Sequence, residues 1–236
     1  VPAAPPRPRG IERNLVITQW DWADWKGFVH DTVSTDKRNP TLNANGLVYG
    51  LQEFSAPDVN ILDPARNTLT RLTAPVRDAD TPFMNPQFVF QPSPYNEEEV
   101  VWSGKASLHN PMMDHEGRVW MTHTIRASQT PAFCREGSSH PSAQLFPVES
   151  SQRHLSVFDP TTGEFTLIDT CFGTHHLQIA EDTDNTVWAS NPGSPVVGWL
   201  NMRRFDETGD EQRSQGWCPY ILDANGNGRQ DEYVEP

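Results

Sequence analysis

The sequence predicts an all-β fold assembled from repeated four-stranded units. Its 21 prolines and 15 glycines are spread along all 236 residues, and no window has an apolar 3.6-residue period long enough for a substantial helix. Short apolar and aromatic runs lie between Asn, Asp, Gly or Pro instead, which is typical of strands. Two supersecondary patterns also recur, and recurrence decides the architecture before any single strand does.

The strand candidates occur along the whole chain. They lie at 14–20, 46–54, 59–63, 88–92, 99–104, 117–125, 154–160, 164–170, 176–180, 185–191 and 196–202. Each is bounded by turn-forming residues, so we expect strands joined mostly by tight connections.

The first recurring pattern is a strand that enters an Asp/Gly/Asn turn and leaves as Val-Trp or Val-Tyr. It is clearest at 110–123 (NPMMDHEGRVWMTH), recurs at 176–191 and is fainter at 42–52. In the second pattern a strand ends at Asp-Pro, a turn follows and another strand returns. This pattern lies at 59–75 and 155–170, with a weaker echo at 200–210.

Joined together, the two patterns make a four-stranded meander, which is the unit of a β-propeller blade. The fold class predicted is therefore all-β, a β-propeller built of four-stranded blades. Three units are expected, at 43–76, 108–172 and 174–219. A closed propeller usually needs at least four blades. Either the N-terminal stretch and the tail supply degenerate blades, or the propeller is incomplete in this chain and further polypeptide completes it; we expect the latter.

The chain divides into three parts on this interpretation. A Pro-rich N-terminal arm covers 1–13, the blades cover 14–219, and a segment resembling a calcium loop covers 220–236. The second blade carries an insertion at about 127–151 that is too long for a tight turn. Long loops of this kind often form binding surfaces.

Composition limits the partners. A net charge of −13 opposes the phosphate neutralisation that nucleic-acid binding needs, so nucleic acid is excluded. Mean hydropathy is −0.62, and no apolar run approaches a membrane span. The chain begins at a small residue followed by the Pro-rich arm, as after removal of a leader, so we expect a periplasmic or extracellular protein.

The three cysteines, Cys134, Cys171 and Cys218, have no C-x-x-C spacing. Zinc-ribbon, thioredoxin-like and c-type haem interpretations therefore lack their signature. We expect one disulfide and one remaining thiol, with the pairing left open.

Two segments carry a family resemblance: LHNPMMDHEGRVWMT (108–122) and GTHHLQIAEDTDNTVWAS (173–190). They resemble the blades of secreted propellers of the streptogramin (virginiamycin B) lyase type and related NHL-type repeats, which read roughly G-P-H-G-h-x-x-x-x-D-G-x-V-W-F-T. The resemblance is confined to the blade-like regions. As a whole, the chain looks more like bacterial exported propellers labelled carboxypeptidase-regulatory-like.

The resemblance implies a lyase that opens an ester-linked ring by elimination, using a histidine at the blade entrance, acidic residues and Mg²⁺. The candidate catalytic residues that follow by position are His109, His175, His176, Glu181 and Asp182. Asn110 stands where the family has a Gly after the histidine.

The histidines also have an interpretation that needs no family. A propeller hub gathers the entrance ends of all blades, so His109, His175 and His176 can converge although they are distant in sequence. Neutral imidazoles suit Zn, Cu or Fe. The alternative is that one histidine caps a strand and the other faces solvent. Glu116, Glu181 and Asp182 flank the entrance positions as candidate general bases or Mg²⁺ ligands, or as ordinary turn residues.

The segment DANGNGRQD (223–231) predicts a calcium loop. Oxygen-bearing side chains alternate along it, and Gly228 permits a sharp turn. The candidate Ca²⁺ residues are Asp223, Asn225, Asn227, Arg229 and Asp231. Val234 replaces the Glu that completes an EF-hand, so the loop resembles those of dockerins and thrombospondin-type repeats. The alternative is a polar Asn-Gly turn.

Three functions follow as hypotheses. The first is an exported binding or scaffold protein with a structural calcium loop and an unidentified small-molecule or protein ligand. The second is a lyase-like or His-metal-dependent enzyme with its site at the hub. The third is a subunit of an extracellular assembly that pairs through its arm or an open blade edge.

Overall fold

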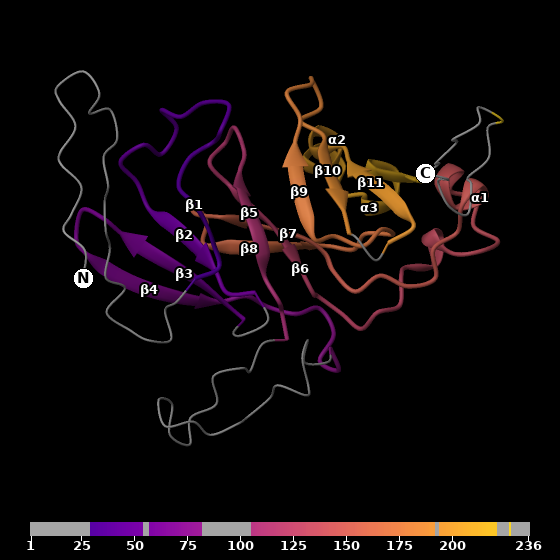
Figure 1. The fold of residues 1–236 in the computed structure, drawn as a ribbon, viewed down its shortest axis with the longest axis horizontal. Coiled ribbons are helices and arrows are strands. Elements are labelled where there is room, and N and C mark those ends of the chain that lie inside the picture. Colours follow the sequence, from indigo (N-terminus) through magenta and orange to yellow (C-terminus); the bar gives the residue numbers. More distant parts are fainter. Residues whose placement is uncertain (1–28, 54–56, 82–104, 192–193, 221–226, 228–236) are drawn as a thin grey trace, which may run out of the picture.

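A computed structural model describes residues 29–53, 57–81, 105–191, 194–220 and 227 (Figure 1). These residues form three four-stranded antiparallel sheets, each following chain order. The strands of the first sheet are β1 (Asp31–Val33), β2 (Val48–Leu51), β3 (Asp58–Asp63) and β4 (Thr68–Thr73). Those of the second are β5 (His109–Met113), β6 (Val119–His123), β7 (His154–Asp159) and β8 (Glu164–Ile168). Those of the third are β9 (His176–Ile179), β10 (Val187–Ser190), β11 (Val196–Leu200) and β12 (Gln215–Pro219).

The all-β class is confirmed, and the three predicted units correspond to the three sheets. The first sheet begins earlier than expected, because β1 at Asp31–Val33 pairs with β2 (Asp31 opposite Leu51). A strand of three residues with no apolar alternation gives almost no sequence signal. The predicted strands at 14–20, 88–92 and 99–104 lie outside the described residues.

The predicted Asp turn and returning strand at 200–210 is wrong. That segment forms α2 (Met202–Thr208), which is followed by α3 (Glu211–Ser214) before β12 returns. The Asn201 side chain accepts a hydrogen bond from the Arg204 N–H at the start of α2, and Gly209 ends the helix at φ 64°. Asn and Gly are standard helix-capping residues. At positions 201 and 209 they favour a helix over the strand that the neighbouring residues suggested.

The second sheet is covered on both faces. Every residue of β6 is buried, whereas β9 alternates between exposed and buried positions. One hydrophobic cluster, including Leu51 and Met121, lies between the first and second sheets. Another, including Trp120 and Ile179, lies between the second and third. Figure 1 shows the consequence, with β5 standing between β1 and β9 so that the first strands of the three sheets are neighbours.

The insertion after β6 is a compact structure held by a disulfide. It contains the 3₁₀ helix η3 (Ala132–Cys134) and α1 (Pro141–Leu145). Cys134 is joined to Cys171 beyond the end of β8, and Cys218 is a thiol. The expectation of one disulfide and one thiol is confirmed.

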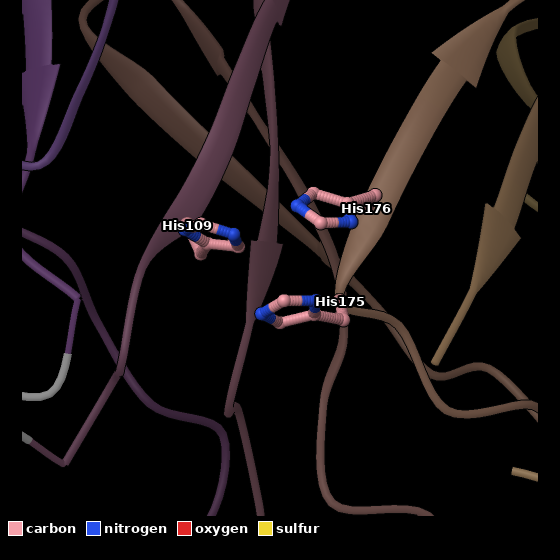
Figure 2. A group of neighbouring side chains, drawn as sticks. All are labelled: His109, His175 and His176. Carbon is pink, nitrogen blue, oxygen red and sulfur yellow. The ribbon is translucent and has the colours of Figure 1, made fainter. Parts of the chain in front are cut away.

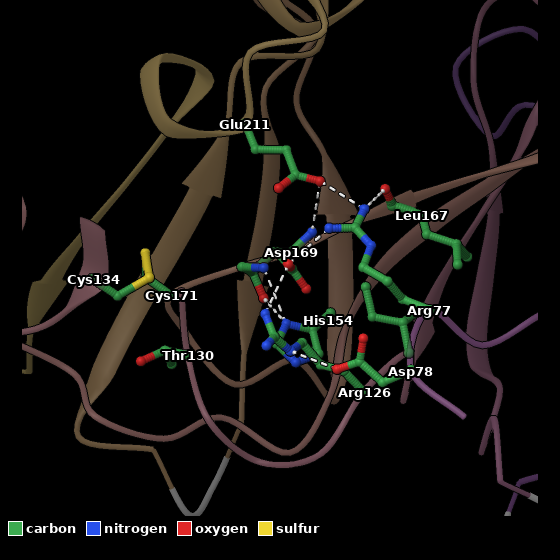
Figure 3. Close-up of polar contacts among 12 residues, drawn as sticks. Arg77, Asp78, Arg126, Thr130, Cys134, His154, Leu167, Asp169, Cys171 and Glu211 are labelled. Atoms are coloured by element: carbon green, nitrogen blue, oxygen red, sulfur yellow. Dashed lines mark hydrogen bonds and ion pairs between the residues drawn. A yellow bond between two sulfur atoms is a disulfide. The ribbon is translucent and has the colours of Figure 1, made fainter. Parts of the chain in front are cut away.

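A network of ion pairs fastens the connections of all three sheets together (Figure 3). The carboxylate of Asp169 lies 2.7 Å from Arg77 Nη1 and 3.0 Å from Arg126 Nη1. Glu211 of α3 accepts a hydrogen bond from Arg77 Nη2 at 2.9 Å and another from the Asp169 N–H at 3.1 Å. Arg77 follows β4, Arg126 follows β6 and Asp169 follows β8, so this network fixes the relative positions of the sheets.

The helices of the described residues are too short or too polar to cross a membrane.

Candidate metal centre

Three imidazoles meet where β5 and β9 begin. The ring centroids of His109 and His175 are 4.5 Å apart, those of His109 and His176 5.2 Å, and those of His175 and His176 4.2 Å. Figure 2 shows the His109 ring directed from β5 toward the other two, with a ring nitrogen on the edge that faces them. One ligand atom from each of the three side chains fits within a span of 4.8 Å. The predicted convergence at the strand entrances is confirmed.

The local backbone explains how His109 is aimed. The pairing of β5 with β6 shifts between His109 and Met112, which is a bulge or similar irregularity. Such irregularities redirect side chains and are frequent beside functional sites. Ser107 and Asn110 on either side of His109 have φ of 41° and 49°, a left-handed conformation that is uncommon for residues other than Gly. Strained backbone of this kind concentrates at functional sites.

Asn110 joins three sheets at this point. Its backbone N–H donates to Asp31 Oδ2 of β1 at 3.0 Å, and its side-chain Oδ1 accepts from the Leu177 N–H of β9 at 2.7 Å. The φ of 49° lies in a region that Gly reaches without strain. Asn is the next most tolerant residue there, and its amide adds the link to β9.

Further polar groups surround the imidazoles. We call the whole set the hub cluster: His30, Asp31, Glu53, His109, His175 and His176. Asp31 Oδ2 lies 2.6 Å from His109 Nδ1 and 3.1 Å from His30 Nδ1. One ligand atom each from His30, Asp31 and His109 also fits within 4.8 Å, so His109 belongs to two potential ligand sets.

Glu53 lies against both ligand sets. Its Oε2 is 3.5 Å from His109 Nδ1, and its Oε1 is 3.5 Å from His175 Nε2. Arg153, only 3% exposed, holds Glu53 Oε1 at 2.5 Å. Arg153 Nη2 also donates to Ser107 Oγ at 2.9 Å. The buried guanidinium therefore compensates the charge of Glu53 and fixes its position.

The protonation of the histidines suits metal binding. Burial lowers the pKa of His109 to about 4, although the Asp31 and Glu53 carboxylates oppose the shift. Burial also lowers the pKa of His175, and the adjacent His176 ring adds to that effect. Burial alone would raise the pKa of Asp31, but the Asn110 N–H and the neighbouring imidazoles outweigh it and keep the pKa below its ordinary value. Near pH 7 His109 and His175 are thus neutral imidazoles beside the Asp31 carboxylate, and both kinds of group are metal ligands.

Several of these nitrogens have no protein hydrogen bond. Within the described part of the chain, both ring nitrogens of His109 and Nδ1 of His175 are buried without a hydrogen-bond partner. The short contact of His109 Nδ1 with Asp31 therefore lacks hydrogen-bond geometry. Buried polar atoms are normally paired, and coordination of an ion is one way to satisfy them. The residues present fit a divalent transition metal.

The acidic candidates from the sequence lie elsewhere. Glu181 and Asp182 are exposed in the turn after β9, away from His176, where β9 begins. Asp182 accepts hydrogen bonds from the Thr186 N–H and hydroxyl, which hold its pKa below the ordinary value. Glu116 is likewise exposed in the turn between β5 and β6. Of the two interpretations offered for these residues, the structure favours ordinary turn residues.

The calcium-loop candidates Asp223, Asn225, Arg229 and Asp231 lie outside the described residues. Asn227 is described and is exposed. The calcium loop stays a prediction.

Sequence reasoning gave no site role to His30, Asp31, Glu53 or Arg153. A three-residue strand that begins at Asp31 carries no repeat signal. The position of His30 does carry a repeat signal, because His30 precedes β1 just as His175 precedes β9. Aligning the faint first unit on its entrance histidine would have placed His30 and Asp31 beside His109.

Comparisons with protein-family models, with curated proteins and with solved structures found no match to this chain. The functional argument therefore rests on the geometry of the hub cluster.

Proposed function

We propose that this chain is part of an exported β-propeller enzyme that holds a divalent transition-metal ion on His109, His175 and His176. The observation that carries this proposal is the convergence of three imidazoles from two sheets, with buried ring nitrogens that have no hydrogen-bond partner among the described residues. The propeller itself is supported by three consecutive four-stranded meanders whose first strands are neighbours.

An enzymatic role fits better than a purely structural metal. Structural zinc sites are closed by four protein ligands, whereas catalytic sites use three and keep a position for water or substrate. His109 is buried, but the His175 side chain is 31% exposed and His176 is exposed. A substrate can therefore approach the ion from the side of β9.

The neighbouring carboxylate defines the class of reaction. A metal ion polarises a carbonyl or lowers the pKa of a bound water, and a carboxylate within reach can accept the proton that is released. Glu53, fixed by Arg153 and 3.5 Å from two of the imidazoles, is in position for that role. This combination suits hydrolysis or elimination at an ester or related group, which includes the reaction implied by the lyase resemblance.

The disulfide supports export. Disulfides persist in oxidising compartments and are rare in the cytosol, so the Cys134–Cys171 bond favours a periplasmic or extracellular location. The binding or scaffold role with a calcium loop stays a prediction, because most of the loop lies outside the described residues.

Metal loading tests the proposal. Metal-free protein would be incubated with excess Zn²⁺, separated from unbound ion by gel filtration, and its zinc per chain measured by elemental analysis. We expect at least one bound Zn²⁺ ion, and one fewer in a His175→Gln/His176→Gln variant. His115→Gln is the matched control, because His115 is exposed in the β5–β6 turn. Equal zinc in the double variant and the unmodified protein, or no zinc in either, would contradict the proposal.

A further inference from the structure

The hub cluster contains two ligand sets that overlap in one residue. The first set is His109, His175 and His176, and the second is His30, Asp31 and His109. The second set comes from the start of β1 together with His109, while the first comes from the starts of β5 and β9. Only His109 of β5, the strand between β1 and β9, is common to both.

We infer that the hub holds two divalent metal ions and that the imidazole of His109 bridges them. The second ion would be bound by His30, Asp31 and His109. This inference rests on the proposed metal centre and adds an ion to it.

The two nitrogens of His109 lie on opposite sides of its ring and face different partners. Nδ1 is directed to the first sheet, 2.6 Å from Asp31 Oδ2 and 3.5 Å from Glu53 Oε2. In Figure 2 a ring nitrogen faces His175 and His176. Both nitrogens are buried, and neither is hydrogen-bonded within the described residues. An ordinary structural histidine satisfies at least one nitrogen with a protein group.

The donors of the second set suit a divalent ion. Two imidazole nitrogens and one carboxylate oxygen are ligands that Zn²⁺, Cu²⁺ and Fe²⁺ accept. His30 is also close to His109, with ring centroids 5.2 Å apart. Its side chain is 56% exposed, so an ion can enter from solvent. The Asn110 N–H fixes the Asp31 carboxylate by its hydrogen bond, as second-shell groups do for metal-binding carboxylates.

The carboxylate of the second ligand set suits a bound cation. The hub cluster has two carboxylates: Glu53 pairs with Arg153, and Asp31 lies beside His109 and His30 of the second ligand set. The first ligand set consists of imidazoles and contains no carboxylate. A bridging imidazole must also lose its remaining N–H proton to solvent, so binding both ions leaves His109 as an anion between two cations. With Zn–N bonds of about 2.1 Å, such a bridge would separate the ions by roughly 6 Å.

The test extends the zinc measurement to the second ligand set. We expect two Zn²⁺ ions per chain in the unmodified protein and one in a His30→Gln/Asp31→Asn variant, because the amide introduced at position 31 can still accept the Asn110 hydrogen bond. His109→Gln is expected to lower the affinity for both ions, by at least about tenfold each. His115→Gln is again the control, and circular dichroism shows whether each variant is folded. His30→Gln alone serves if the double variant does not fold.

Each other outcome overturns the inference. If the unmodified protein binds one ion and the His30→Gln/Asp31→Asn variant still binds it, there is no second ion, and the proposed function is unaffected. One ion that is lost from either double variant means that both ligand sets bind a single ion. No bound ion at all contradicts the two-ion inference and the proposed function together.

Copper gives an independent readout of the bridge. Two Cu²⁺ ions joined by one imidazolate couple magnetically, so the electron paramagnetic resonance signal per copper is expected to fall well below that of isolated Cu²⁺. In the His30→Gln/Asp31→Asn variant the single remaining copper should give its full signal. Full intensity from two bound coppers in the unmodified protein would show that His109 does not bridge them.

Discussion

Asn110 decides the geometry of the hub cluster at the level of a single residue. It holds a left-handed backbone, its N–H fixes Asp31, and its side chain is bonded to the Leu177 N–H. Moving this residue would shift His109 relative to both β1 and β9. Its conformational and hydrogen-bonding roles can be separated by substitution.

We expect Asn110→Ala to lower the free energy of unfolding by about 2–3 kcal/mol. The change leaves the Leu177 N–H unpaired, at about 1–2 kcal/mol, and puts Ala in a left-handed conformation that Asn tolerates better, at about 1 kcal/mol. Asn110→Gly removes the same hydrogen bond without that strain, so it should be about 1 kcal/mol more stable than the Ala variant. Urea unfolding of the two variants measures the difference, and equal stabilities would show that the backbone relaxes out of the left-handed region.

The sequence predicted that the three histidines could converge, because the position of a residue within a repeat does not depend on the exact number of residues between repeats. His109, His175 and His176 stand where strands begin, and strands that begin at equivalent places in successive units meet. It did not predict the carboxylates that join them. Glu53 lies just after β2, in a position that no repeat pattern marks, and Glu181 and Asp182 were favoured because they are close in sequence. Proximity in sequence is a poor guide along a strand, because each residue advances the chain by about 3.3 Å and the two ends of the strand lie at opposite ends of the sheet.

At the level of elements, the insertion after β6 depends on a few cross-links for its structure. Trp217 of β12 donates its N–H to Ser142 Oγ of α1 at 3.0 Å and its indole Nε1–H to the Phe146 carbonyl at 2.7 Å. The disulfide between Cys134 and Cys171 closes a loop with a sequence separation of 37. Short helices such as η3 and α1 are not stable alone, so these links determine their conformation.

Reduction of the disulfide should lower the free energy of unfolding by about 4 kcal/mol, the chain-entropy value for a loop of this length. The comparison is urea unfolding of the unmodified protein with and without dithiothreitol, and of a Cys134→Ser/Cys171→Ser variant without it. Cys218→Ser is the control, because Cys218 is a thiol in the folded protein. If reductant has no effect on the unmodified protein, the bond does not constrain the unfolded chain in the way the loop length implies.

The sequence predicted helices and strands well where turn-forming residues flank them. It predicted them poorly where helix caps or tertiary contacts determine the structure. The Asp-Pro and Asp-Gly-rich turns located β3, β6, β7 and β10 closely. The segment that became α2 has an Asn-capped start and a Gly at its end, but only seven residues between them, which is too short for an apolar period to emerge. The strand β12 pairs with β11 but was not recognised, because α2 and α3 separate the two strands in sequence.

For the whole molecule, the second sheet is the central packing partner of the other two sheets. It contributes to the hydrophobic clusters on both sides and supplies two histidines to its own interior. His123 of β6 and His154 of β7 are directly opposite each other, and both are buried. His123 Nδ1 is 2.8 Å from Ser156 Oγ, and His154 Nδ1 accepts the Thr170 N–H at 3.0 Å. Neither ring is part of the hub cluster.

These two histidines make the stability of the fold depend on pH above the range where carboxylates titrate. Burial lowers the pKa of His123 to about 3, and the His154 ring adds to the shift. Burial lowers the pKa of His154 to about 4 despite the opposing charge of Asp169. Both rings are therefore neutral in the folded protein at about pH 5, whereas in the unfolded chain they take up protons below about pH 6.5.

The sign of the effect follows from proton binding. Because the unfolded state binds more protons, the contribution of each histidine is fully present above about pH 6.5 and is lost as the pH falls toward the folded-state pKa. Each loses up to about 1.4 kcal/mol per pH unit in that window, so between about pH 6.5 and pH 5 the pair should cost about 3 kcal/mol. Urea unfolding across this range measures the slope. In His123→Gln the slope should fall by about the share of one histidine, whatever the change in absolute stability. An unchanged slope in His123→Gln would mean that this ring is protonated in the folded protein or that the second sheet opens before the rest of the molecule.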